Sequence, residues 1–288
     1  MAVKRVEEFA FREFRVVVGV DSSGHVAVGY DGQGDEIDRT SPCALEDAKV
    51  EIKTLLARKS EDFVDFPSAI RLFRRAYPEG FEDPFFYDDE RKYKIDAHKT
   101  ARDLLGKDQL SNLMAADDCV SVSAAARKVF INLVFPNEAI AFSEFLKRDG
   151  SACAEFAHHL FALLHGDAFD EAFDRIAVLL KPFGAAKWPI LTYWPFILWP
   201  DKHMFLKPEV AQECAWRLGE DFGYESYPRS EVYRRYLNFV TTLRKGIAPL
   251  KPRDNIDVQT FMYAIGKRGF VRHTEQARLT WEAKGTAQ

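Results

Sequence analysis

The chain has 288 residues, of which 47% are hydrophobic and 29% are charged. This composition suits one large folded domain or two modest ones, and it excludes a wholly disordered chain. No apolar run approaches the roughly 20 residues of a membrane span, and the N-terminus lacks the apolar core of a signal peptide. The four cysteines lie far apart and are expected to be reduced thiols. We therefore expect a cytoplasmic globular protein with no membrane partner.

The net charge of −4 is distributed unevenly along the chain. Residues 181–288 contain 17 Lys and Arg against 11 Asp and Glu, a net charge of +6, whereas residues 1–180 carry −10. A basic C-terminal third is typical of proteins that bind a polyanion, but ordinary solvated helix faces produce the same pattern.

Residues 1–60 are predicted to form a β-hairpin followed by a helix. Residues 11–20 and 25–30 alternate in hydropathy, and the turn residues of 21–24 separate them. Ser41-Pro42 then precedes a predicted helix over residues 44–58.

Residues 61–288 are predicted to form a helical body. The spacing of apolar residues predicts helices over 67–77, 88–105, 124–133, 136–148, 152–165, 169–180, 209–218, 230–245 and 255–265. The expected fold class is therefore α+β, mostly α, with a small N-terminal β element followed by a helical body.

A helix-hairpin-helix-like motif is predicted within residues 180–194, where two helices are joined by a tight turn at Gly184. The backbone N–H groups of such a turn and of the following helix N-terminus can hold a phosphate, and Lys181 and Lys187 flank them. A plain helical hairpin without a ligand has the same pattern.

A proline-punctuated loop follows over residues 199–210. It brings a carboxylate, an imidazole and amines close to aromatic residues, which is a setting that can shift pKa values. The alternative is a surface loop whose charges are solvated.

The order of hairpin, loop and helix resembles the helix-hairpin-helix DNA glycosylases. Residues 182–188 occupy the place of that family's hairpin, residues 205–210 that of its catalytic carboxylate loop, and residues 254–266 that of its late helix. The chain departs from the family motif at Ala186, where a second glycine would stand. It also lacks a four-cysteine iron–sulfur pattern, so no cofactor and no metal are expected.

A second resemblance runs through most of the chain from about residue 70. Residues 77–81, 90–94, 188–189, 200–208 and 256–259 are similar to a family of bacterial proteins associated with anti-phage DNA glycosylases, which remove glucosylated hydroxymethylcytosine from phage DNA. The resemblance implies double-stranded DNA with modified bases as the partner and no obligate protein partner.

These resemblances imply base flipping followed by hydrolysis of the N-glycosidic bond. A carboxylate near the sugar would stabilise its positive charge or activate a water, and Asp201 is the first candidate with Glu209 as the substitute. Lys207 would either attack the sugar carbon or bind a phosphate.

Other residues are expected to hold the base and the DNA backbone. The expected base pocket consists of Tyr193, Trp194, Trp199, His203, Asp257 and Gln259, and the expected DNA contacts are Lys181, Gly184, Lys187 and Lys202. For Asp257 the alternative is a place in the N-terminal cap of a helix. Residues 90–94 form either a solvated helix face or a secondary DNA contact.

Two further functions use the same features. A non-catalytic helix-hairpin-helix DNA-binding protein would grip phosphates without chemistry, and a helical interaction protein would have no nucleic-acid role. The strong salt dependence of phosphate contacts separates the last possibility from the others.

Overall fold

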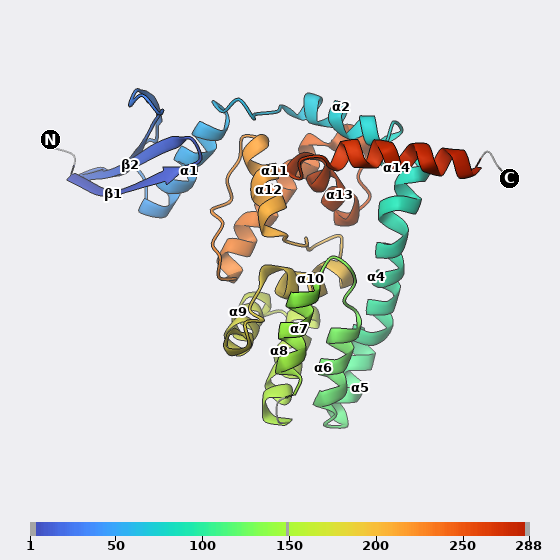
Figure 1. The fold of residues 1–288 in the computed structure, drawn as a ribbon. Coiled ribbons are helices and arrows are strands. Elements are labelled where there is room, and N and C mark those ends of the chain that lie inside the picture. The colour runs from blue at the N-terminus through green and yellow to red at the C-terminus, as the bar shows by residue number, and fades with distance from the viewer. Residues whose placement is uncertain (1–3, 148–149, 286–288) are drawn as a thin grey trace.

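The computed structural model describes residues 4–147 and 150–285 (Figure 1). It has the predicted α+β class, with a small N-terminal sheet followed by a helical body. Among these residues, no helix has both the length and the apolar character needed to cross a membrane.

The N-terminal sheet is antiparallel, and its strands follow in chain order: β1 (Lys4–Phe11), β2 (Phe14–Asp21), β3 (Gly24–Tyr30) and β4 (Glu36–Arg39). Strands β2 and β3 are the predicted hairpin, and Val17 pairs with Val28 in their register. The sequence analysis missed the two outer strands. Strand β1 carries four charged residues among eight, and β4 has only four residues, so neither shows a clear alternating pattern.

Helix α1 (Leu45–Ala57) covers one face of this sheet and forms a small core with it. Val16, Val18 and Ile52 are fully buried in that core. A Cβ atom at Gly29 would lie 2.6 Å from Cδ2 of Leu56, so the glycine permits close packing of the helix on the strand.

The helical body begins with α2 (Phe66–Ala76), η1 (Gly80–Glu82), α3 (Pro84–Phe86), the π-helical turn η2 (Tyr87–Arg91), α4 (Lys92–Leu105), α5 (Lys107–Ala115) and α6 (Cys119–Lys128). It continues with α7 (Pro136–Phe145), α8 (Gly150–His165), α9 (Phe169–Leu180), η3 (Lys181–Phe183) and α10 (Trp188–Leu198). The last part contains α11 (Pro208–Arg217), α12 (Ser230–Gly246), η4 (Ala248–Leu250), α13 (Asn255–Gly266) and α14 (Phe270–Gly285).

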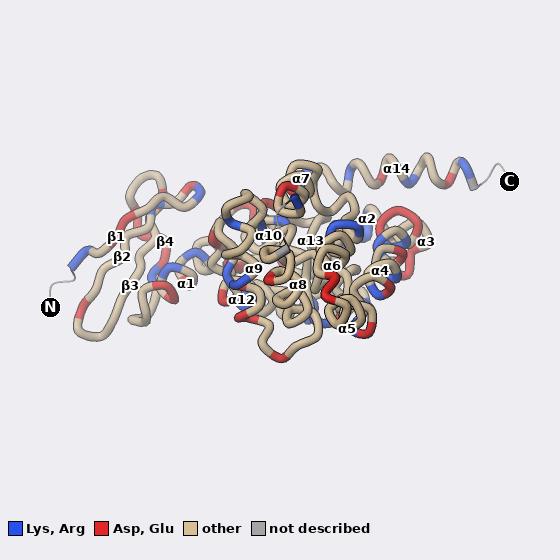
Figure 2. Tube along the Cα trace, turned by 90° about the horizontal axis from the view of Figure 1, so that it is seen from below, with Lys and Arg blue, Asp and Glu red and all other residues tan. Residues whose placement is uncertain are grey.

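The body has two groups of helices (Figure 1). Helices α5 to α9 form the lower group, whereas α2 and α11 to α14 form the upper one, and α4 runs from one group to the other. Seen from below, the sheet lies on one side of the body and α14 projects from the other (Figure 2). Lys and Arg are interspersed with Asp and Glu along most elements in this view, so the basic excess of the C-terminal third is not gathered on one element.

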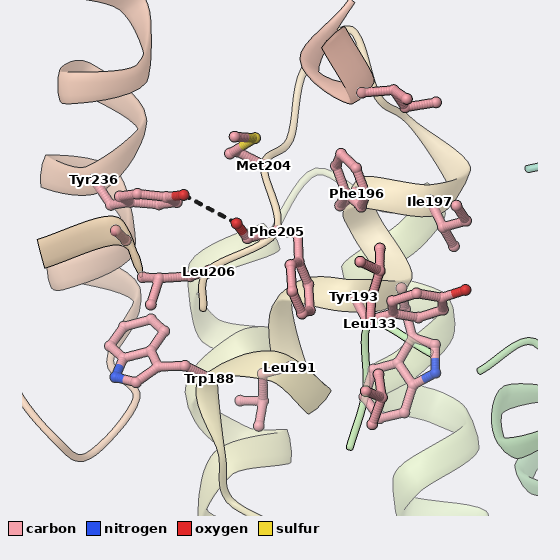
Figure 3. Close-up of a cluster of buried hydrophobic side chains, with 14 of the residues drawn as sticks. Leu133, Trp188, Leu191, Tyr193, Phe196, Ile197, Met204, Phe205, Leu206 and Tyr236 are labelled. Atoms are coloured by element: carbon pink, nitrogen blue, oxygen red, sulfur yellow. Dashed lines mark hydrogen bonds between the residues drawn. The ribbon is translucent and has the colours of Figure 1, made fainter. Parts of the chain in front are cut away.

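Helix α10 lies at the centre of the body. All eleven of its residues are buried, as expected of a helix that is apolar on every side. Figure 3 shows its side chains packed against the chain segment that follows it, and the Tyr236 hydroxyl donates a hydrogen bond to the Phe205 carbonyl at 2.9 Å. This segment leads directly to Lys207.

Three helices of the described residues were not predicted, and one was predicted at a shifted position. The three-residue α3 is too short to show a periodic pattern. Helix α5 has a single fully buried residue, Leu110, and α14 has few apolar residues, so neither shows a strong apolar stripe. The helix predicted over residues 124–133 lies at Cys119–Lys128, followed by an irregular segment that reaches Phe135.

Candidate functional site

Helices α9 and α10 form the predicted helical hairpin. Gly184 has the left-handed φ of 65° that ends η3, and the N–H of Ala185 donates to the carbonyl of Leu180 at 3.2 Å. A Cβ atom at Gly184 would meet nothing within 4 Å, so the turn is open to its surroundings.

The hairpin turn offers backbone donors. Within the described part of the chain, the N–H groups of Ala186 and Trp188 have no hydrogen-bond acceptor. Lys187 is exposed beside them, and the amine of Lys181 lies 5.2 Å from the ring centroid of Tyr227. This arrangement can hold a phosphate by backbone donors and flanking amines.

A cavity of about 630 Å³, here named the Lys207 cavity, lies where α4, α11, the end of α13 and the β1–β2 turn meet. The residues that matter for its chemistry are Arg12, Tyr93, Phe135, Lys207, Glu209, Glu213, Tyr263, Lys267 and Arg268. The segment before α11 is tied to α10, because the N–H of Leu206 donates to Oγ1 of Thr192 at 3.0 Å. Two predicted catalytic residues, Lys207 and Glu209, therefore share one cavity that is connected to the second helix of the hairpin.

The amine of Lys207 is buried, and the structure shows no hydrogen-bond partner for it among the described residues. Its Nζ atom lies 2.8 Å from the ring centroid of Phe135. Burial lowers the pKa of Lys207, while the nearby carboxylates of Glu138 and Glu209 act in the opposite direction. A desolvated amine of this kind is a better nucleophile at neutral pH than a solvated lysine.

Glu213 is a carboxylate of this cavity that the sequence analysis missed. It follows Glu209 by four residues, so both lie on one face of α11. Its Oε2 atom accepts a hydrogen bond from Arg12 at 2.7 Å, and its Oε1 atom is buried without a partner among the described residues. The four-residue spacing in the sequence could have identified it.

Arg12 reaches the cavity from the N-terminal sheet. It occupies the β1–β2 turn with a left-handed φ of 58°, and its guanidinium lies 5.1 Å from the ring centroid of Trp216. Trp216 is itself part of the small core under the sheet. No sequence signal links Arg12 to Glu213, because 201 positions separate them.

Tyr93, Phe135 and Tyr263 give the cavity an aromatic wall. Burial raises the pKa of Tyr93 and of Tyr263, so both phenols are neutral and can donate hydrogen bonds. Lys267 and Arg268 add exposed positive charge. The cavity thus combines a planar apolar wall with cations and hydrogen-bonding groups.

Behind Tyr93 lies a network of buried charges. The amine of Lys94 donates to Glu90 at 2.7 Å, to Gln259 at 2.6 Å and to Thr260 at 3.0 Å. The prediction of a solvated helix face over residues 90–94 is therefore wrong, since Lys94 is fully buried.

The same network contains Asp257, which was predicted to read the base together with Gln259. Arg91 donates to Asp257 at 2.6 Å and to Asp254, and Arg253 binds Asp257 from the other side. Asp254 caps α13 by accepting hydrogen bonds from the N–H groups of its first turn. Asp257 and Gln259 are thus buried and fully engaged with cations, and neither lines the Lys207 cavity.

Two predicted base-pocket aromatics lie in the core. Tyr193 donates its hydroxyl to the carbonyl of Val129 at 2.6 Å, and Trp194 donates its indole N–H to the carbonyl of Ala126 at 2.9 Å. Both side chains are fully buried and line neither large cavity.

The remaining predicted residues lie near the C-terminal end of α10. Trp199, Lys202 and His203 line a second cavity of about 860 Å³, here named the Trp199 cavity. Asp201 is exposed and lines neither cavity. The structure therefore separates Asp201, the first catalytic candidate, from Lys207 and Glu209.

In the described ranges 4–147 and 150–285, no group of three His, Cys, Asp or Glu residues is placed to hold a metal ion. Comparisons with models of protein families, with curated proteins and with solved structures give no match to this chain.

Proposed function

We propose that this chain is a DNA glycosylase that excises a modified base, and that the Lys207 cavity receives the flipped nucleotide. The observation that carries the proposal is the amine of Lys207, which is buried without an acceptor among the described residues in a cavity that Glu209 and Glu213 also line. The cavity volume of about 630 Å³ is in the range of sites for small organic ligands.

In this proposal Lys207 is the nucleophile. Its neutral amine attacks C1′ of the deoxyribose, the new C–N bond forms, and the glycosidic bond breaks with its electron pair on the departing base. Glu209 takes the proton that the amine loses and passes it to the departing base, and Glu213 faces the positive charge that develops on the sugar. Opening of the sugar ring gives an imine, and water hydrolyses it to regenerate Lys207 and leave an abasic site.

The hairpin and the cavity rim hold double-stranded DNA in this scheme. The donors near Gly184 contact backbone phosphate together with Lys181 and Lys187, and Lys267 and Arg268 neutralise phosphates beside the cavity. Phage DNA with modified bases is the proposed substrate, and defence against phage in the cytoplasm is the proposed role.

The test uses phage DNA that carries glucosylated hydroxymethylcytosine, with unmodified DNA as the comparison. We expect abasic sites only in the modified DNA, and we expect borohydride to trap a covalent protein–DNA complex by reducing the imine. Lys207→Gln should abolish both signals. Lys99→Gln is the matched control, because Lys99 is an exposed lysine of α4 that the proposal does not use.

Two other results have distinct meanings. Abasic sites without a trapped complex would retain the glycosylase and assign Lys207 to phosphate binding, with a carboxylate-activated water as the nucleophile. Salt-sensitive binding to both DNAs without abasic sites would support a non-catalytic DNA-binding protein.

A further inference from the structure

The Trp199 cavity takes no part in the proposed base excision. The start of α5, the end of α8, the start of α9 and the end of α10 surround it. The Gly184 turn joins the opposite ends of α9 and α10, so about 18 Å of helix separates it from this cavity, at about 1.5 Å per residue for the 12 residues of α9. The cavity is therefore remote from the proposed DNA contact.

A fixed aromatic ring forms one wall of the cavity. Trp199 is 40% exposed, but its indole N–H donates to the carbonyl of Leu164 at 2.8 Å. His165 packs against the indole with its ring centroid 6.0 Å away and donates from Nε2 to the carbonyl of Leu105 at 2.7 Å. The indole is thus held in place with a large part of its surface open, an arrangement that suits stacking of a planar ring.

Three cations line the same cavity: Arg102, Lys107 and Lys202. All three are exposed, and none forms an ion pair within the part of the chain that the structure describes. Asp108 and Asp167 also line the cavity and provide hydrogen-bond acceptors. The cations of the lining can therefore bind an anion, while its carboxylates can accept hydrogen bonds from hydroxyl or amino groups of the same ligand.

The cations stand next to the N-terminus of α5, which has nine residues and no side-chain cap. Gly106 occupies the cap position, and a Cβ atom there would lie 2.4 Å from the carbonyl oxygen of Arg102. A capping side chain is thus excluded by the close approach of the backbone, and the first N–H groups of α5 remain available to a ligand.

A second ring closes the interior of the cavity. His203 stacks on Phe169 with ring centroids 4.7 Å apart, and the ring of Tyr233 lies nearly parallel to it with a centroid distance of 6.2 Å. Its Nδ1 atom is buried without a partner among the described residues. Burial lowers the pKa of His203 to about 4, so at neutral pH it offers hydrogen bonding and not positive charge.

We propose that the Trp199 cavity is a nucleotide-binding site. The base stacks on Trp199, the phosphate binds Arg102, Lys107 and Lys202, and the carboxylates accept hydrogen bonds from sugar hydroxyl or base amino groups. A free nucleotide and a nucleotide at the end of a single DNA strand share this chemistry. The proposal is independent of base excision, because it uses no residue of the Lys207 cavity.

The test is calorimetric titration of the full chain with AMP, dCMP, adenosine, inorganic phosphate and a short single-stranded oligonucleotide. We expect saturable binding of the nucleotides, at least tenfold tighter than that of adenosine or phosphate alone. Tighter binding of the oligonucleotide than of the mononucleotides assigns the site to a DNA strand, and the reverse order assigns it to a free nucleotide.

Charge-reversal variants locate the site. Lys107→Glu combined with Lys202→Glu should weaken nucleotide binding at least tenfold, and Trp199→Leu should do the same. Lys128→Glu is the matched control, because Lys128 is an exposed lysine at the end of α6 that lines neither cavity. Absence of saturable binding, or an equal loss with Lys128→Glu, would overturn the proposal.

Discussion

Lys207 and Lys94 are two lysines whose amines lie away from water, and their partners differ. The amine of Lys94 has three oxygen acceptors within 3.0 Å, whereas that of Lys207 has none among the described residues. A buried charge without a partner is costly, so burial lowers the pKa of Lys207. Lys94 is held by its acceptors, whereas Lys207 has the unpartnered amine on which the proposed reaction depends.

The lowered pKa of Lys207 gives a prediction about the pH dependence of its chemical modification. Because its pKa is lowered, its amine becomes neutral at a lower pH than that of a solvated lysine. Glu209→Gln removes a carboxylate that raises this pKa, so the inflection of the amine-modification rate should move to lower pH. The rate is measured on the Lys207 peptide with an amine-reactive reagent. Glu144→Gln is the control, and an inflection that moves upward or stays fixed would contradict the prediction.

Lys94 gives a prediction about stability. Lys94→Ala leaves Glu90 and Gln259 without their common donor, and breaking such a buried pair costs about 3 to 5 kcal/mol. Glu90 keeps some contact with water, so the lower end of this range is expected. Urea denaturation measures the loss. Lys99 is an exposed lysine of the same helix, so Lys99→Ala should change the free energy of unfolding by no more than about 0.5 kcal/mol. Equal losses for the two variants would show that Lys94 does not stabilise the fold.

At the residue scale, the sequence identified two residues of the Lys207 cavity and missed the buried charges behind it. The loop after α10 was predicted to carry reactive groups, and Lys207 and Glu209 do share a cavity. Burial of Lys94 and Asp257 was not predictable, because each has a partner more than 160 positions away: Gln259 for Lys94 and Arg91 for Asp257. Spacing along one helix carries no information on contacts of that range.

At the scale of elements, two glycines next to helix ends differ in what fixes them. Gly184 has a left-handed φ with open space around it, whereas Gly106 has an ordinary φ of −61° and a backbone oxygen where its Cβ would lie. At position 184 a glycine is favoured because the backbone is left-handed. At position 106 it is favoured because a backbone oxygen occupies the place of a side chain.

This difference predicts two separate losses of stability. Gly184→Ala should cost about 1 kcal/mol, the strain of a left-handed alanine. Gly106→Ala should cost about 1 to 3 kcal/mol, because the junction between α4 and α5 must shift to relieve the contact. Chemical denaturation of both variants tests the order, and a larger loss at Gly184 would contradict it.

Elements with a strong apolar stripe were predictable, and those held mainly by tertiary contacts were not. Residues 169–180 and 230–245 were predicted as helices, and α9 and α12 lie there. Helix α14 forms ion pairs with distant elements: Glu275 pairs with Arg75, and Arg278 pairs with Asp83. The residues of each pair are about 200 positions apart, so no local sequence pattern predicts this helix.

At the scale of the whole molecule, the N-terminal sheet is joined to the body through α11. One side of that helix presents Glu213 to Arg12, and Trp216 enters the core beneath the sheet. The sheet therefore supplies part of the Lys207 cavity, although the sequence analysis placed it in a separate N-terminal region.

This junction predicts an effect of the sheet on activity. Arg12→Gln removes the cation that holds Glu213, so formation of abasic sites should slow at least tenfold, equal to about 1.4 kcal/mol in the barrier. Arg15→Gln is the matched control, since Arg15 lies on the neighbouring strand and contacts Tyr30 and Glu8. Equal rates for the wild type and Arg12→Gln would exclude the sheet from the site.

The Lys207 cavity draws its walls from Arg12 near the start of the chain and from Arg268 near its end. During synthesis on the ribosome, Arg12 emerges long before Arg268. When the sheet, the hairpin and Lys207 have left the ribosome, Tyr263 and Lys267 have not yet been synthesised. A chain terminated before residue 260 would therefore expose Lys207 without the part of the cavity wall that Tyr263 and Lys267 supply.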